Sequence, residues 1–112
     1  MNVADEIDAL IAEVVVDANG DDEQLWSFRQ WFEDSASFPF RATIAGVEIE
    51  VIDIDYDGDD RRGLVARCAR EGQRHSVSLL DIAPTGSIPI DTANLLAAYR
   101  RWANAEPVEG SR

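Results

Sequence analysis

Apolar residues at the start of the chain recur at intervals of three and four positions, the spacing of one face of an α-helix. This spacing predicts an amphipathic helix over residues 3–18. Asn2 is its expected N-cap, and Asp5 and Glu6 fall in the first turn, where the helix dipole favours acidic side chains. Gly20 supplies the expected stop. The apolar positions are Val3, Ile7, Leu10, Ile11 and Val14.

A second helix is predicted to begin at Asp21, because Gln24 stands three residues further on in a capping-box pattern. The helix is expected to end before Phe38-Pro39-Phe40, since a residue that precedes proline is driven out of the helical region. Its buried stripe is expected to consist of Leu25, Phe28 and Phe32.

From Phe40 to Ala83 the period changes to two, which predicts a small antiparallel sheet. The apolar positions are odd-numbered from Val47 to Val51 and even-numbered from Ile52 onward. An unbroken strand cannot keep both sets on one face, so we expect a β-bulge or bend near Val51-Ile52. Three aspartates would then project together, away from the core: Asp53, Asp55 and Asp57.

The remaining pattern predicts further strands and a closing helix that begins at Asp91. The helix is expected to carry Leu95, Leu96, Tyr99 and Trp102. Before it we expect a turn at 57–60, a strand over 63–70, a tight turn at Glu71-Gly72, a strand over 73–78 and a short piece at 82–83.

The predicted fold class is therefore α+β. Two N-terminal helices are followed by a curled antiparallel sheet of four to five strands and a C-terminal helix. The curl expected at the bulge favours an SH3- or Sm-like partial barrel as the architecture of the sheet.

Length and composition narrow the class of protein. The 112 residues favour one domain over 1–112, with a frayed tail at 106–112. A single Cys excludes an internal disulfide, and no CxxC pair or His/Cys cluster could hold zinc. No apolar run reaches the ~18–20 residues of a membrane span, and the N-terminus lacks the basic stretch of a signal peptide, so we expect a cytoplasmic protein.

The net charge of −12 is concentrated in one half of the chain. Residues 1–60 hold 17 acidic residues and two arginines, which give a formal charge of −15. Residues 61–112 hold five acidic residues and eight arginines, which give a formal charge of +3. Such acidity disfavours nucleic acids and anionic membranes as partners. It favours metal cations or basic protein surfaces.

The clearest candidate for metal chemistry is the acidic stretch from Asp53 to Asp60. Carboxylates at alternate positions before a glycine turn resemble the first half of an EF-hand loop. Position 12 of that loop would be Leu64 instead of Glu, and the flanking segments are predicted strands, so an EF-hand is rejected. Two interpretations stay open: a cation site that needs a bend or further oxygens, or solvated aspartates neutralised by Arg61 and Arg62.

Two more acidic groups lie at helix ends. Residues 17–23 are rich in oxygen ligands around Gly20, but helix capping also explains them. Glu33 and Asp34 lie near the C-terminal end of the second helix, where the helix dipole disfavours acids, which is a pattern typical of functional positions. A salt bridge between Glu33 and Arg29 is an ordinary alternative.

No catalytic residues are predicted. His75, the single histidine, stands beside Arg74 on a predicted strand, and Cys68 shares the parity of core positions. No nucleophile elbow or phosphate-binding glycine loop is present.

The order of several segments resembles the CcbP-type calcium-binding family of small acidic bacterial proteins. The resemblance covers about residues 5–104. It rests on residues 15–20, Trp31-Phe32-Glu33-Asp34, Phe38-Pro39-Phe40, the alternation of Val47 to Val51, the acidic hairpin of 55–60, residues 79–84, and the last helix with Tyr99 and Trp102. The chain departs from the family in lacking its insertion between the first two strands and in having Trp31-Phe32 where the family is Tyr-rich.

The resemblance implies a non-EF-hand protein that binds Ca²⁺ through clustered surface carboxylates, as a buffer or a signalling protein without catalysis. The expected metal ligands are Glu33, Asp34, Asp53, Asp55, Asp57, Asp59 and Asp60. The alternative function is an acidic interaction module that docks on a basic protein or mimics nucleic acid.

Overall fold

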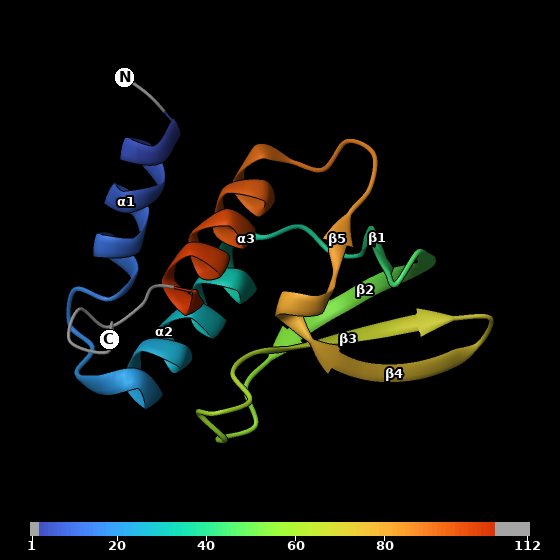
Figure 1. Ribbon diagram of the computed structural model, residues 1–112, viewed down its shortest axis with the longest axis horizontal. Helices are drawn as coiled ribbons and strands as arrows, with labels where there is room; N and C mark the ends of the chain where they lie inside the picture. The colour runs from blue at the N-terminus through green and yellow to red at the C-terminus, as the bar shows by residue number, and fades with distance from the viewer. Residues whose placement is uncertain (1–2, 105–112) are drawn as a thin grey trace, which may run out of the picture.

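The computed structural model describes residues 3–104 as three helices and five strands (Figure 1). The helices are α1 (Val3–Val14), α2 (Gly20–Ser35) and α3 (Ile90–Ala103). The strands are β1 (Phe40–Ile44), β2 (Val47–Asp55), β3 (Val65–Arg70), β4 (Gln73–Ser78) and β5 (Ala83–Pro84), with a 3₁₀ turn at Leu79–Asp81. The predicted α+β class is confirmed, and the predicted tail at 106–112 lies outside the described residues.

The helices form one layer and the strands another (Figure 1). α2 is the central element, because it contacts α1, α3 and strand β2. Leu25, Phe28 and Phe32, the predicted stripe of this helix, are each at most 1% exposed. Burial of these three side chains therefore holds the helical layer against the sheet.

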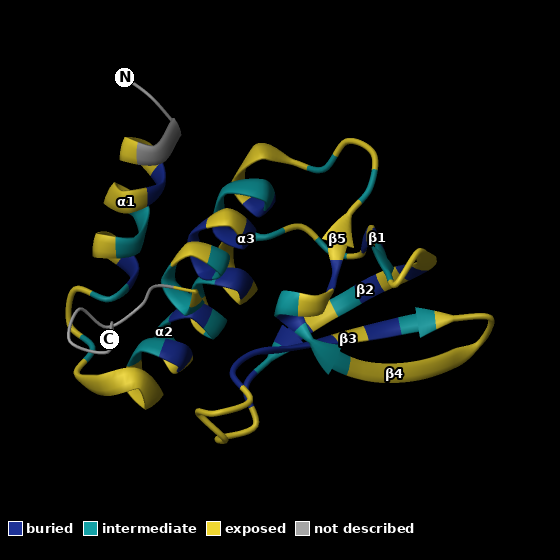
Figure 2. Ribbon diagram, viewed as in Figure 1, coloured by how far each residue is buried: buried dark blue, intermediate teal, exposed yellow. Residues whose placement is uncertain are grey.

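The interior continues into the strands and α3, so both layers share one core (Figure 2). Tyr99 on α3 meets Phe28 edge to face, with the ring centroids 5.5 Å apart. Cys68, predicted to be a core residue, is 1% exposed, and His75 lies exposed on β4.

The sheet is antiparallel and open, with the strand order β4-β3-β2-β1-β5. The expected partial barrel is not confirmed for residues 3–104, where the edge strands β4 and β5 do not pair with each other. β5, which pairs with β1, has only two residues. A strand this short cannot extend the sheet as far as β4.

The predicted β-bulge is confirmed in β2. Val51 pairs with Cys68 and Asp53 with Arg67, so Ile52 is the extra residue. The bulge keeps Val51 and Ile54 buried on the same face. It also places Asp53 directly opposite Arg67 of β3.

Three helix boundaries differ from the prediction. α1 ends at Val14, and residues 15–17 form a turn, because the β-branched run at its end weakens the helix. Gly20, with φ of 84°, is the first residue of α2. The predicted Asp21/Gln24 capping box is replaced by a hydrogen bond from the backbone N–H of Asn19 to Glu23 Oε1 at 2.8 Å.

At the start of α3, Pro89 precedes the helix and Asp91 lies within its first turn, so Asp91 is not the cap that we expected. Its carboxylate still lies where the helix dipole favours it. Within residues 3–104, the helices are all too short or too polar to cross a membrane.

Candidate metal centre

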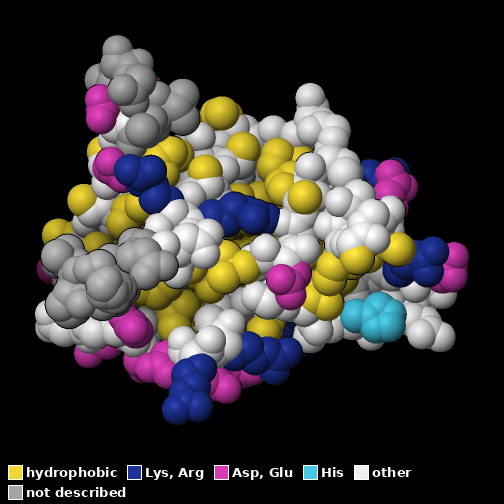
Figure 3. All heavy atoms as spheres, viewed as in Figure 1, with side chains coloured by type: hydrophobic (Ala, Val, Ile, Leu, Met, Phe, Trp, Pro, Cys, Tyr) yellow, Lys and Arg dark blue, Asp and Glu magenta, His cyan; other side chains and the backbone are white. Residues whose placement is uncertain are grey.

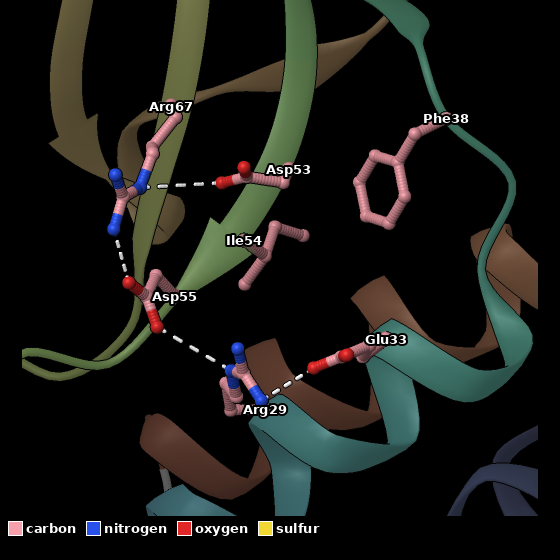
Figure 4. A pocket seen from close by; sticks show the side chains of 7 residues that line it. All are labelled: Arg29, Glu33, Phe38, Asp53, Ile54, Asp55 and Arg67. Atoms are coloured by element: carbon pink, nitrogen blue, oxygen red, sulfur yellow. Dashed lines mark hydrogen bonds and ion pairs between the residues drawn. The ribbon is translucent and has the colours of Figure 1, made fainter.

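A groove of about 360 Å³ lies between α2 and the sheet, where one carboxylate of α2 and two of β2 come together (Figure 4). Its walls are Arg29, Glu33, Phe38, Asp53, Ile54, Asp55 and Arg67. The groove is therefore built from one turn of a helix, the chain that follows it, and two neighbouring strands.

Local geometry explains why these side chains face the groove. Arg29 and Glu33 are one helical turn apart on α2 and so share a face. Asp53 and Asp55 are two residues apart on β2, on either side of the buried Ile54, and so project from one face of the sheet. Without the bulge that precedes them, these two aspartates would point toward the core.

Two arginines join the carboxylates into a chain of ion pairs (Figure 4). Arg67 Nε lies 3.3 Å from Asp53 Oδ1, and Arg67 Nη2 donates a hydrogen bond to Asp55 Oδ2. Arg29 Nε lies 3.3 Å from Asp55 Oδ1, and Arg29 Nη1 pairs with Glu33. The order along this chain is Asp53, Arg67, Asp55, Arg29, Glu33.

Asp55 is the central carboxylate of the chain. Burial tends to raise its pKa, but the backbone N–H of Tyr56, the hydrogen bond and charge of Arg67 and the charge of Arg29 outweigh burial. The pKa of Asp55 is therefore held below its ordinary value, and the carboxylate is charged at neutral pH. Arg29 Nε is buried without a hydrogen bond, because its contact with Asp55 is poorly aligned.

The structure brings Glu33, Asp53 and Asp55 to the groove, but it does not bring Asp34 there. Asp34 Oδ1 accepts a hydrogen bond of 3.1 Å from Gln30 Nε2 on the exposed side of α2. Adjacent helical residues point about 100° apart, so Glu33 and Asp34 cannot face the same groove.

Asp57 and Asp59 lie in the loop beyond β2, and their oxygens are largely taken by the loop itself. Asp57 accepts the backbone N–H of Asp59 at 3.1 Å and pairs with Arg62 at 3.3 Å. Asp59 Oδ1 accepts the backbone N–H groups of Arg61 and Arg62. These contacts match the alternative in which the aspartates of the turn are neutralised locally.

Asp60 belongs to a second acidic region, where this loop meets the start of α2. Asp60 and Asp21 both line a hollow of about 440 Å³. The neighbouring Asp22 Oδ1 accepts a hydrogen bond of 2.6 Å from the Tyr56 hydroxyl. Burial, the bond to Asp22 and the charges of Asp22, Asp60 and Asp59 together raise the pKa of Tyr56.

Figure 3 shows acidic and arginine side chains interspersed along the lower edge of the molecule, near the start of α2 and the loop between β2 and β3. Within the acidic stretch at 17–23, capping of a helix is only one of two structural roles. Glu23 caps α2, while Asp22 fixes the end of β2 through Tyr56.

Sequence reasoning missed the role of Arg67. It also treated the pair of Arg29 with Glu33 as an alternative to a site, whereas the structure shows this pair inside the groove. The helical spacing of Arg29 and Glu33 was a usable signal. The position of Arg67 opposite Asp53 depends on strand register, for which the sequence carries no local signal.

The donor set of the groove fits a hard cation in its chemistry. All three acidic side chains offer carboxylate oxygens, the ligands that Ca²⁺ and Mg²⁺ prefer. Across residues 3–104, however, no three His, Cys, Asp or Glu side chains are grouped closely enough to hold a metal ion. In the described residues, Arg29 and Arg67 pair with these carboxylates instead.

The chain is thus a small α+β protein with an oxygen-rich groove on its surface. A family model for calcium binding, that of the CcbP proteins, matches residues 8–103. The chain therefore belongs to the CcbP family of calcium-binding proteins. This match confirms the resemblance seen in the sequence.

Two solved structures have a similar fold. The crystal structure of Anabaena CcbP is 22% identical, with 88% of this chain and 89% of that chain covered and a TM-score of 0.75. A calcium-binding protein in its calcium-binding form is 19% identical, with 100% and 98% covered and a TM-score of 0.73. None of the curated proteins compared with the chain matches it.

Proposed function

We propose that this protein binds Ca²⁺ through carboxylates of the groove and acts as a calcium buffer or signalling protein without catalysing a reaction. Membership of a calcium-binding family supports the choice of ion. We further propose the cytoplasm as its location, as expected from the sequence.

The observation that carries this proposal is the meeting of Glu33, Asp53 and Asp55 at one groove. Glu33 comes from α2, and the two aspartates come from β2. The three carboxylates therefore meet only in the folded chain and do not form a short sequence motif. Ca²⁺ takes six to eight oxygens in flexible geometry, and three carboxylates with water can supply them. Mg²⁺ demands a stricter octahedron, so we expect weaker binding of Mg²⁺.

The other expected ligands, Asp34, Asp57, Asp59 and Asp60, lie outside this groove. We propose that the carboxylates of the 57–60 loop and of the start of α2 add to the negative field that attracts the cation. Asp60 and Asp21, which share the second hollow, are the pair best placed for a further ion.

The test is isothermal titration of chelator-treated protein with Ca²⁺ and with Mg²⁺. We expect binding of Ca²⁺ at micromolar or weaker affinity, a rise in melting temperature on binding, and less heat with Mg²⁺. Asp55→Asn is expected to weaken binding by about tenfold or more, because ligand charge sets affinity at such sites.

Glu50→Gln is the matched control, since Glu50 is an exposed carboxylate of the same strand outside the groove. It is expected to bind Ca²⁺ like the wild type. The absence of both heat and a melting-temperature rise at millimolar Ca²⁺ would refute the proposal.

The alternative is an acidic module that docks on a basic protein. It is favoured by Trp26, which is 45% exposed and one helical turn from Asp22, because exposed tryptophan is enriched in protein interfaces. Binding of a defined basic peptide would then weaken steeply with salt and be indifferent to chelator. Calcium-dependent binding of the peptide would favour a signalling role over both the alternative and a simple buffer.

A further inference from the structure

We propose that Arg67, assisted by Arg29, is an internal competitor of the calcium ion. In the ion-free protein these guanidinium groups occupy the carboxylate oxygens that the ion needs, and Ca²⁺ binds by displacing Arg67. The proposal rests on the proposed function and names how that site is regulated.

Asp55 makes contacts through both of its carboxylate oxygens. Its Oδ1 accepts the backbone N–H of Tyr56 at 2.8 Å and lies 3.3 Å from Arg29 Nε, while its Oδ2 is bound by Arg67 Nη2. Both oxygens are thus engaged with positive or donor groups. A cation of coordination distance about 2.4 Å cannot bind Asp55 through Oδ2 unless Arg67 leaves.

Arg67 holds a second carboxylate at the same time. Its Nε lies 3.3 Å from Asp53 Oδ1, so one guanidinium spans both aspartates of β2. On a strand, side chains two residues apart stand ~6.5–7 Å from each other, too far to share an ion without moving. Departure of Arg67 therefore frees two ligands in one movement and lets them turn toward a common ion.

The two arginines differ in how easily they can leave. The side chain of Arg67 is 52% exposed, whereas that of Arg29 is 30% exposed and its Nε is buried. Arg29 is also tied to Glu33 on its own helix. Arg67 can swing into solvent at little cost, so Arg67 is the group that is exchanged and Arg29 is the fixed one.

The charge count of the groove gives the consequence for affinity. Three carboxylates and two guanidinium groups leave a net charge of −1, and loss of Arg67 from the groove leaves −2. The arginines therefore stabilise the ion-free state against carboxylate repulsion, and they lower the affinity of the site. The protein keeps its three ligands together without an ion and binds Ca²⁺ more weakly than an unopposed carboxylate cluster would.

The deciding experiment compares Arg67→Gln with Arg41→Gln by calcium titration and by melting of the chelator-treated proteins. Arg67→Gln is expected to bind Ca²⁺ about three- to tenfold more tightly, since two exposed ion pairs of modest strength no longer compete. Its ion-free form is expected to melt at a lower temperature and to gain more from Ca²⁺ than the wild type does.

Arg41→Gln is the matched control, because it makes the same change in net charge and removes an exposed pair with Glu48 on the same sheet. It is expected to keep the wild-type affinity. Arg67→Lys keeps the charge but loses the two-pronged contact, so its gain in affinity should lie between those of the wild type and Arg67→Gln.

Three results would overturn the proposal while leaving calcium binding intact. Equal affinity in the wild type and Arg67→Gln would show that the two cations do not compete. Weaker binding by Arg67→Gln would show that Arg67 positions the ligands. If only Arg62→Gln, which removes the pair with Asp57, increased the affinity for Ca²⁺, the ion would bind in the 57–60 loop. No binding by the wild type would instead refute the proposed function itself.

Discussion

Gly63 shows how one residue secures the end of the acidic loop. It has φ of 74°, and a Cβ at this position would lie 2.5 Å from the Tyr99 hydroxyl oxygen. That hydroxyl accepts a hydrogen bond of 3.0 Å from the buried backbone N–H of Leu64. The glycine thus allows α3 to hold the chain where the loop returns to β3.

Gly63→Ala is therefore expected to lower the free energy of unfolding by more than about 2 kcal/mol, from backbone strain together with the clash against Tyr99. Gly46→Ala is the control, because Gly46 has φ of 81° but no atom within 4 Å of an added Cβ. It is expected to show the strain alone and to cost about 1 kcal/mol. Urea denaturation measures both, and equal losses would argue against the close contact.

At the scale of elements, the bulge in β2 matters most for the site. Ile52 is the extra residue, and because the bulge accommodates it, Asp53 and Asp55 stay on the outer face of the sheet. Because side chains alternate along a strand, a change of one residue moves every following side chain to the opposite face. The position of the carboxylates is therefore a property of the whole strand.

Insertion of one alanine between Ile52 and Asp53 is expected to abolish cooperative unfolding and calcium binding together. It would turn Asp53 and Asp55 toward the core and Ile54 toward solvent, and uncompensated burial of charge exceeds the stability of a small domain. Ile52→Ala keeps the residue count and is expected to cost only about 1 kcal/mol. Circular dichroism melts and calcium titration check both variants, and a folded, calcium-binding insertion variant would show that the register of the strand after the bulge does not matter.

For the whole molecule, the relevant property is how a chain of net charge −12 stays folded. A long-range contact of α3 opposes the repulsion, because Arg101 Nε pairs with Asp8 on α1 at 2.5 Å. The basic second half of the chain thus neutralises part of the acidic first half through the tertiary fold.

Stability is expected to fall as the pH falls through the acid range, in part because of Asp55. Its pKa is lower in the folded chain than its ordinary value of 3.8. A carboxyl of this kind adds stability above its unfolded pKa, and the contribution is lost as the pH falls toward the folded pKa. Asp55→Asn should therefore flatten the decline of melting temperature below pH 3.8, as measured in chelator-treated protein. An unchanged slope would contradict the role of the ion pairs.

The helices, the fold class and the bulge could be predicted from the sequence because each leaves a local periodic pattern. Leu25, Phe28 and Phe32 recur at helical spacing, and the change of parity after Val51 requires an extra residue in the strand. The exact helix ends, such as that at Val14, depend on competing caps and turns. The predicted ends therefore differ from the observed ends by a few residues.

The acidic composition and the order of motifs were enough to identify the calcium-binding family, and three of the seven expected ligands, Glu33, Asp53 and Asp55, line the groove. Which carboxylates meet was settled by packing: Glu33 reaches Asp55 through Arg29, while Asp34, its neighbour in sequence, faces away. The open sheet and the place of Arg67 likewise follow from strand register. The physical reason is the distance along the sequence over which each feature is determined. Periodicity depends on neighbouring residues, whereas a site depends on contacts between elements that only the folded chain brings together.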